Sequence, residues 1–278
     1  MKRLSLIFLS LFVCLGLSAQ TEEGAADSLD RYKGLDDLLD QFYVTMERAS
    51  LEAKYEEFDG LISTCQDSLT RQHVALQIFD HYCYSRVMGE EAVAIHIYDE
   101  WIASGKVKTR SEFEQLIDDQ YVLFNRGNLV GMTAQQVTLY KPHVGTRTVP
   151  VPGRITVMFF YDTQCSKCRL ESRVLPGVLE EVDFPMDFVA VYVGDDRREW
   201  KNFRPTLKVR NRKVRTFHLW DPQVDSDYQL AYGVTATPRL YVVWKDGEII
   251  GRRLEVTNLK EVLHYITVAN NAEEEKAE

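Results

Sequence analysis

Hydrophobic residues recur along the chain at two different spacings, and the change between them divides the sequence into two halves. Over residues 27–140 they return every three or four positions, which is the spacing of the buried face of an α-helix. Further helices are expected over residues 74–87, 90–104 and 111–125, and Ser111 with Glu114 fits a capping box at the start of the last one. No repeat of fixed period is present in the sequence. The pattern therefore predicts a compact all-α N-terminal domain.

Later residues form short, nearly continuous apolar runs, which are typical of strands covered on both faces. These runs are "ITVMFFY" (155–161), "MDFVAVYV" (186–193) and "RLYVVW" (239–244). Helical patterns over 165–182 and 197–207 separate the runs. After the third run, "KDG" (245–247) predicts a hairpin turn, and a closing helix is expected over 258–268. This order predicts an α/β fold with a mixed sheet flanked by helices.

The first residues have the layout of a secretory signal peptide. Lys2 and Arg3 precede an apolar run over 4–17, and small residues come before Ala19. We therefore expect a signal peptide over 1–19, export to the periplasm and a helical domain over 20–135. A second domain is expected over 136–268, and a disordered acidic tail over 269–278. Lipoprotein anchoring through Cys14 is disfavoured, because Val13 stands where such a signal needs a small residue.

The charge of the chain excludes one large class of partners. Its 33 Lys and Arg residues against 42 Asp and Glu residues give a formal net charge of -9. Nucleic-acid binding is not expected, because phosphates require a basic face. The exception is the basic stretch "KVRNRKVR" (208–215), interpreted as a solvated loop or strand edge, with a docking patch for an acidic partner as the alternative.

Four cysteines remain after the signal peptide. Cys65 and Cys83 lie on the helical stripes, so we expect two small buried residues, with a disulfide between adjacent helices as the alternative. Cys165 and Cys168 form a C-x-x-C in "YDTQCSKCRLE" (161–171), where the first long strand ends and its helix begins. At that end of a helix, unpaired N–H groups and the helix dipole favour a thiolate and lower the pKa of the first cysteine.

A zinc site is one alternative interpretation of the C-x-x-C. A structural zinc site needs four ligands, but there is no second C-x-x-C, and the six histidines lack metal-ligand spacing. No metal is therefore expected. His218 is interpreted as a hydrogen-bonded histidine on a strand, with an active-site role as the alternative.

A second motif, "YGVTATPRLYVVWKDGEIIG" (232–251), together with the C-x-x-C resembles the thioredoxin family. The resemblance covers about residues 131–268 and is strongest to the secreted TlpA/ResA-type thiol-disulfide oxidoreductases. "REWKNF" (198–203) and "FHLWDP" (217–222) further resemble thioredoxin-like proteins of Bacteroidota with a helical N-terminal region. The resemblance implies a cis proline at Pro238, with Thr237 offering its backbone to an extended substrate chain.

The same resemblance assigns roles to the site residues. Cys165 would be the nucleophile and Cys168 the resolving thiol, reducing protein disulfides with electrons from a membrane-bound reductase and without any cofactor. Thioredoxin has a tryptophan where this chain has Gln164 and a buried aspartate where it has Phe159. ResA-like proteins instead use a glutamate at the position of Glu171, which would handle protons for Cys168; the alternative is an ordinary exposed glutamate on a helix.

Two alternatives to this enzyme remain. Peroxiredoxins share the fold, but their threonine and proline before the cysteine are replaced here by Asp162 and Met158. The other alternative is a binding module in which Cys165 and Cys168 form an inert structural disulfide. The sequence favours neither a substrate-selecting nor a dimerising role for the helical domain.

Overall fold

The computed structural model describes residues 31–277, and the signal-peptide prediction and Cys14 lie outside that range. The chain separates into two compact units. One contains the described residues up to Ser85 together with Ala92–Gln115, and the other contains Arg86–Glu91 and the residues from Leu116 onward. The expected boundary at residue 135 differs from this division, because the residues just before it pack in the second unit.

The first unit consists of helices, so the predicted all-α N-terminal region is confirmed. Its elements are α3 (Lys33–Met46), α4 (Leu51–Thr64), α5 (Ser68–Cys83), α6 (Glu91–Ile97), the π-helix η1 (Tyr98–Ala103) and the start of α7 (Glu112–Asn125). Apolar side chains at the expected spacing form its core, among them Phe58, Ile62, Val74 and Ile78, all fully buried.

Two histidine–aspartate contacts link these helices. His73 contacts Asp36 at 2.6 Å, and His96 contacts Asp59 at 2.9 Å. Each histidine ring also stacks on a tyrosine, Tyr32 or Tyr55.

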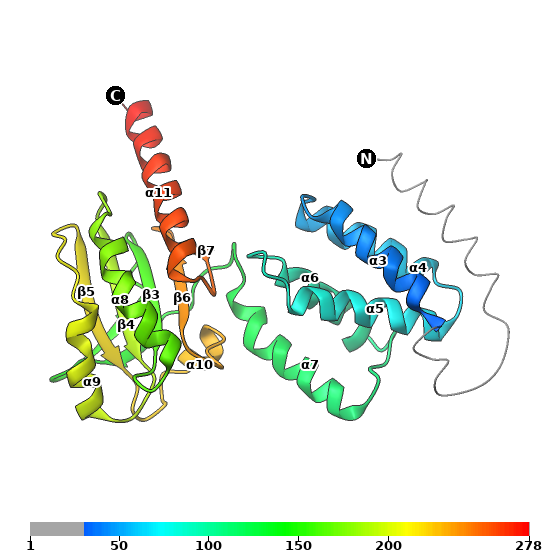
Figure 1. The fold of residues 1–278 in the computed structure, drawn as a ribbon, viewed down its shortest axis with the longest axis horizontal. Helices are drawn as coiled ribbons and strands as arrows, with labels where there is room; N and C mark the ends of the chain where they lie inside the picture. Colours follow the sequence, from blue (N-terminus) through cyan, green and yellow to red (C-terminus); the bar gives the residue numbers. More distant parts are fainter. Residues whose placement is uncertain (1–30, 278) are drawn as a thin grey trace. The chain divides into compact units, whose positions relative to one another are not determined.

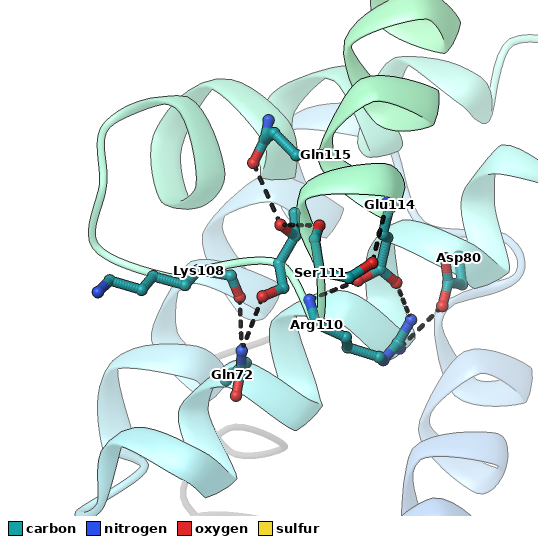
Figure 2. Close-up of polar contacts among 8 residues, drawn as sticks. Gln72, Asp80, Lys108, Arg110, Ser111, Glu114 and Gln115 are labelled. Carbon is teal, nitrogen blue, oxygen red and sulfur yellow. Dashed lines mark hydrogen bonds and ion pairs between the residues drawn. The ribbon is translucent and has the colours of Figure 1, made fainter.

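The predicted cap of α7 forms with one change (Figure 2). Ser111 Oγ accepts the N–H of Glu114 at 3.1 Å, as expected. The Glu114 carboxylate, however, accepts the N–H of Arg110 rather than that of Ser111, and it also binds the Arg110 side chain. Arg110 reaches on to Asp80 of α5 at 3.0 Å, and Gln72 of α5 donates to the Lys108 carbonyl at 2.8 Å. The cap thereby fixes the loop before α7 to α5.

The second unit is built on one seven-stranded mixed sheet (Figure 1). Its strands are β1 (Val137–Tyr140), β2 (Thr146–Val149), β3 (Ile155–Tyr161), β4 (Met186–Tyr192), β5 (Val214–Trp220), β6 (Arg239–Val243) and β7 (Ile249–Gly251). They lie in the order β2-β1-β5-β4-β3-β6-β7. β3, β4 and β5 are parallel, whereas β6 pairs antiparallel with β3, and β7 pairs antiparallel with β6. The α/β fold with a mixed sheet and the final hairpin are thus confirmed.

Helices cover the sheet on both faces. The core on one face takes residues from β3, β4 and β6 together with α8 (Ser166–Glu180), α9 (Arg197–Phe203), the 3-10 helix η3 (Arg204–Leu207) and α11 (Val256–Ala277). The opposite core includes α10 (Tyr228–Ala231). Every residue of β3 and β4 is buried, which explains why those two strands read as unbroken apolar runs.

A buried arginine holds the segments before the sheet to the second unit. Arg252 is 2% exposed and pairs with Glu91. Its guanidinium also donates to Asn125 at the end of α7 and to Asn128 in η2 (Arg126–Asn128). Because a buried charge must keep its partners, this network places the end of α7 with the sheet.

The C-terminal residues differ from the expectation of a disordered tail. α11 continues to Ala277, so residues 269–277 are helical (Figure 1). Alanine, glutamate and lysine dominate this segment and are strong helix formers, so the helix continues through it.

Candidate active site

Cys165 occupies the junction between the central strand and its following helix. β3 ends at Tyr161, and Cys165 is the N-cap of α8 with an extended backbone (φ -73°, ψ 117°). Its Sγ accepts the backbone N–H of Cys168 at 3.1 Å. A sulfur thus takes the capping place that a serine or aspartate oxygen usually fills, and it faces the positive end of the helix dipole.

The two cysteines of the motif have unequal environments. They are joined as a disulfide with Cα atoms 5.2 Å apart. Cys165 is half-buried and reachable from solvent, whereas Cys168 is 0% exposed within the core beneath α8. An external partner can therefore approach Cys165 first.

A distant segment completes the surroundings of Cys165. The Thr237–Pro238 bond is cis, as is Val149–Pro150, and β6 begins directly afterwards at Arg239. Antiparallel pairing of β6 with β3 brings this segment to the end of β3. The carbonyl oxygen of Thr237 lies 3.4 Å from Cys165 Sγ. The structure thus brings together the two motifs that lie some seventy residues apart in the sequence.

Glu171 lies one turn after Cys168 on α8, and its side chain is 9% exposed. Burial raises its pKa, although Lys167 opposes this effect, and Glu255 adds to it. Lys167 Nζ is 4.0 Å from Glu171 but only 2.7 Å from Glu255, so the lysine is held mainly by the exposed acid. Glu171 Oε2 is buried without a hydrogen-bond partner among the described residues. Such a carboxyl group is more readily protonated than an exposed one.

One further acid supports the loop before Cys165, and sequence reasoning missed it. Glu199 on α9 accepts hydrogen bonds from the Gln164 side chain at 2.7 Å and from Thr163 Oγ1 at 2.7 Å. Asp162 accepts the Gln164 N–H at 2.7 Å. Glu199 belongs to the "REWKNF" segment, but nothing local in that segment indicates a partner thirty-five residues earlier.

Metal-ligand clusters and membrane-spanning helices were sought among residues 31–277. Nowhere in residues 31–277 do three or more His, Cys, Asp or Glu side chains cluster in a way that could hold a metal ion. Across the same range, no helix combines the length and apolar character needed to cross a bilayer.

Comparisons with known proteins agree on the fold of this region. Residues 153–249 match a family model described as thioredoxin-like. A thioredoxin-like protein from Bacteroides caccae is similar at 14% identity and a TM-score of 0.64, covering 84% of this chain and 86% of its own. The thioredoxin domain of a thiol-disulfide oxidoreductase from Bacteroides vulgatus is similar at 16% identity and a TM-score of 0.42, covering 49% of this chain and 96% of its own.

A third solved structure is a thiol:disulfide interchange protein from a Bacteroides species. It is similar at 17% identity and a TM-score of 0.41, covering 50% of this chain and 90% of its own. No curated protein matches the sequence significantly. The family match, the similarity across both units in the first structure, and the C-x-x-C at the start of α8 lead to one conclusion: the chain carries a thioredoxin-like domain over residues 153–249 behind a helical N-terminal region.

Proposed function

We propose that this protein is an exported thiol-disulfide oxidoreductase that reduces disulfides of other proteins through Cys165 and Cys168. The observation that carries the proposal is the position of Cys165, half-buried at the N-terminus of α8 with its Sγ on the N–H of Cys168. A thiolate at this position is stabilised by the backbone donor and the helix dipole. The names of the similar Bacteroides proteins support the same chemistry.

The reaction begins from the dithiol. The Cys165 thiolate attacks one sulfur of a substrate disulfide, forms a mixed disulfide and expels one substrate thiolate. The Cys168 thiolate then attacks Cys165 Sγ and releases the second substrate thiolate. Cys165 and Cys168 are left as a disulfide, two electrons have passed to the substrate, and the two substrate thiolates take up protons. A second dithiol protein, proposed to be a membrane-bound reductase, restores the dithiol.

Glu171 is proposed to accept the proton of the Cys168 thiol. Cys168 is fully buried, so its thiol cannot pass a proton directly to solvent. Glu171 follows it by one helical turn, and residues three apart share a helix face. Because its Oε2 has no hydrogen-bond partner in the described structure, this oxygen is available to take the proton.

Thr237 and Pro238 are proposed to dock the substrate. The Thr237 carbonyl lies 3.4 Å from Cys165 Sγ, so a chain that pairs with this backbone brings its own sulfur to Cys165. Main-chain pairing of this kind accepts different sequences, because the hydrogen bonds involve no side chain. Such tolerance suits an enzyme that reduces several proteins.

Capture of mixed disulfides tests the proposal. Cys168→Ser protein should retain substrates on Cys165 as species that a reductant dissolves, whereas the Cys165→Ser/Cys168→Ser double variant should capture none. Insulin reduction measured with dithiothreitol as the electron source should proceed with the wild type only. Absence of both trapping and insulin reduction by correctly folded protein would favour the inert binding module instead.

A further inference from the structure

The second unit contains a pocket that the proposed redox site does not use. It has a volume of about 350 Å³ and lies between the β5 strand and the α9–η3 segment. Its lining consists of Lys201, Arg204, Pro205, Lys208, Val209, Thr216 and His218. None of these residues is hydrogen-bonded to Cys165 or Cys168. The volume is in the range of small-molecule sites.

The pocket concentrates positive charge. Lys201, Arg204 and Lys208 contribute three cations; Arg204 lies over the Trp200 ring, and among residues 31–277 none of the three forms an ion pair with an acidic side chain. The neighbouring basic residues differ, because Arg215 is neutralised by Asp187 at 2.7 Å. In a chain with a net charge of -9, three cations gathered without acidic partners require a physical reason. A bound anion would supply it.

Three of the lining residues carry buried polar atoms that lack hydrogen-bond partners. Arg204 Nε, Thr216 Oγ1 and His218 Nδ1 are buried, and none has a hydrogen-bond partner among the described residues. The interpretation of His218 as a hydrogen-bonded strand histidine is therefore wrong at Nδ1, although the residue does lie on a strand. Burial and the charge of Arg204 lower the pKa of His218 to about 4, so its ring is neutral at neutral pH. Buried polar atoms are costly unless they gain a partner, and a ligand can be that partner.

We propose that this pocket binds a small multivalent anion of the phosphate-ester type. Arg204 offers a planar guanidinium that matches phosphate oxygens, and Lys201 and Lys208 add point charges. Thr216 contributes a hydroxyl donor from β5, while Pro205 and Val209 provide an apolar wall for the organic part of the ligand. A small ligand is favoured because the three cations line one pocket of about 350 Å³.

Titration calorimetry with inorganic pyrophosphate at low ionic strength tests the site. We expect saturable one-to-one binding with a dissociation constant below about 1 mM. Arg204→Gln should weaken it at least about tenfold, because a charge-assisted hydrogen bond is lost. Arg212→Gln is the matched control: it removes the same charge from the neighbouring basic stretch 208–215, but Arg212 does not line the pocket, and binding should be unchanged.

A second variant separates a specific site from diffuse charge. Thr216→Val preserves shape and charge while removing one buried donor, so it should weaken pyrophosphate several-fold without lowering the thermal unfolding midpoint. Equal weakening by Arg204→Gln and Arg212→Gln, with no effect of Thr216→Val, would overturn the site. Binding of citrate but not of pyrophosphate would overturn its assignment to phosphate esters. Wild-type protein that binds neither anion would overturn the proposal entirely.

Discussion

The two pairs of cysteines occupy opposite ends of helices. Cys165 caps the N-terminus of α8 and receives a backbone N–H, whereas Cys65 is the C-cap of α4 and Cys83 is the last residue of α5. Neither Cys65 nor Cys83 is in a disulfide, so the alternative of a bridge between their helices is wrong. Cys65 Sγ lies near the carbonyl oxygen of Leu61, and burial raises its pKa to about 11.

Under the proposed function, the position of each cysteine on its helix accounts for part of the difference between the reactive thiol and the inert ones. The N-terminus presents N–H groups that stabilise a thiolate, and the C-terminus presents carbonyl groups that do not. Burial adds to the difference because it disfavours the charged form of Cys65.

Removal of Cys165 should have the largest effect. Cys165→Ser should lower insulin reduction to background, a loss of at least about 1000-fold, because no other described thiol occupies a helix N-terminus. Cys65→Ala and Cys83→Ala serve as controls and should keep wild-type rates once folding is verified by circular dichroism. An active Cys165→Ser protein would place the reactive thiol elsewhere.

Alkylation should rank the thiols of the reduced wild-type protein. At pH 7, iodoacetamide should modify Cys165 more than about 100-fold faster than Cys65, since only the thiolate reacts. Peptide mass spectrometry over time measures each site separately. Comparable rates at the two cysteines would remove the helix-end explanation.

Replacement of Glu171 tests the proton acceptor proposed for Cys168. Glu171→Gln should slow release of the mixed disulfide by about 10- to 100-fold, because Cys168 loses its proton acceptor. Stopped-flow measurement across pH separates this step from the first attack. The pH profile should also change, and an identical profile in the variant would exclude Glu171 from the mechanism.

The same substitution has a consequence for stability, with a definite sign. Burial raises the folded pKa of Glu171 above its ordinary value of 4.5, so the folded state binds the proton more tightly than the unfolded state. Stability contributed by this group is present below pH 4.5 and declines as pH rises through the raised pKa. Glu171→Gln should therefore be more stable than wild type at pH 7 and lose this advantage near pH 4 in urea unfolding.

The smallest effect is expected from Glu199, a positioning residue for the loop before Cys165. Glu199→Ala removes the hydrogen bonds to Gln164 and Thr163. Insulin reduction should fall less than about tenfold, because Gln164 is exposed and water can replace part of the contact. Glu199→Gln keeps an acceptor oxygen and should recover most of the rate. A loss in Glu199→Gln as large as in Glu199→Ala would show that the charge matters and not the hydrogen bonds.

Sequence reasoning succeeded where the pattern is local or fully buried. β3, β4 and β6 were predicted because both faces of these strands are covered, and α8 because a cysteine cap and an apolar stripe mark it. β1 and β2 were not predicted as strands, because each has only four residues and lies near the edge of the sheet. The antiparallel pairing of β1 with β2 depends on partners that a single short run does not reveal.

The site residues show the same limit. The cysteines and the Thr237–Pro238 segment could be identified because two motifs carry them. Glu199 and the pocket around Arg204 could not, since their partners come from β5 and from loops far away in the sequence. The unpartnered Nδ1 of His218 could not be predicted either, because the residues that line the pocket with it come from α9, η3 and the loop after η3, which no periodicity links to β5.

The reduction potential of the Cys165–Cys168 pair distinguishes a catalytic dithiol from a structural disulfide. Equilibration with glutathione or dithiothreitol buffers, followed by mass-tagging of the thiols, measures it in the wild-type protein. We expect a value between about -120 and -270 mV, the range of catalytic pairs. A disulfide that stays oxidised below about -300 mV would contradict it and identify the pair as a structural bridge.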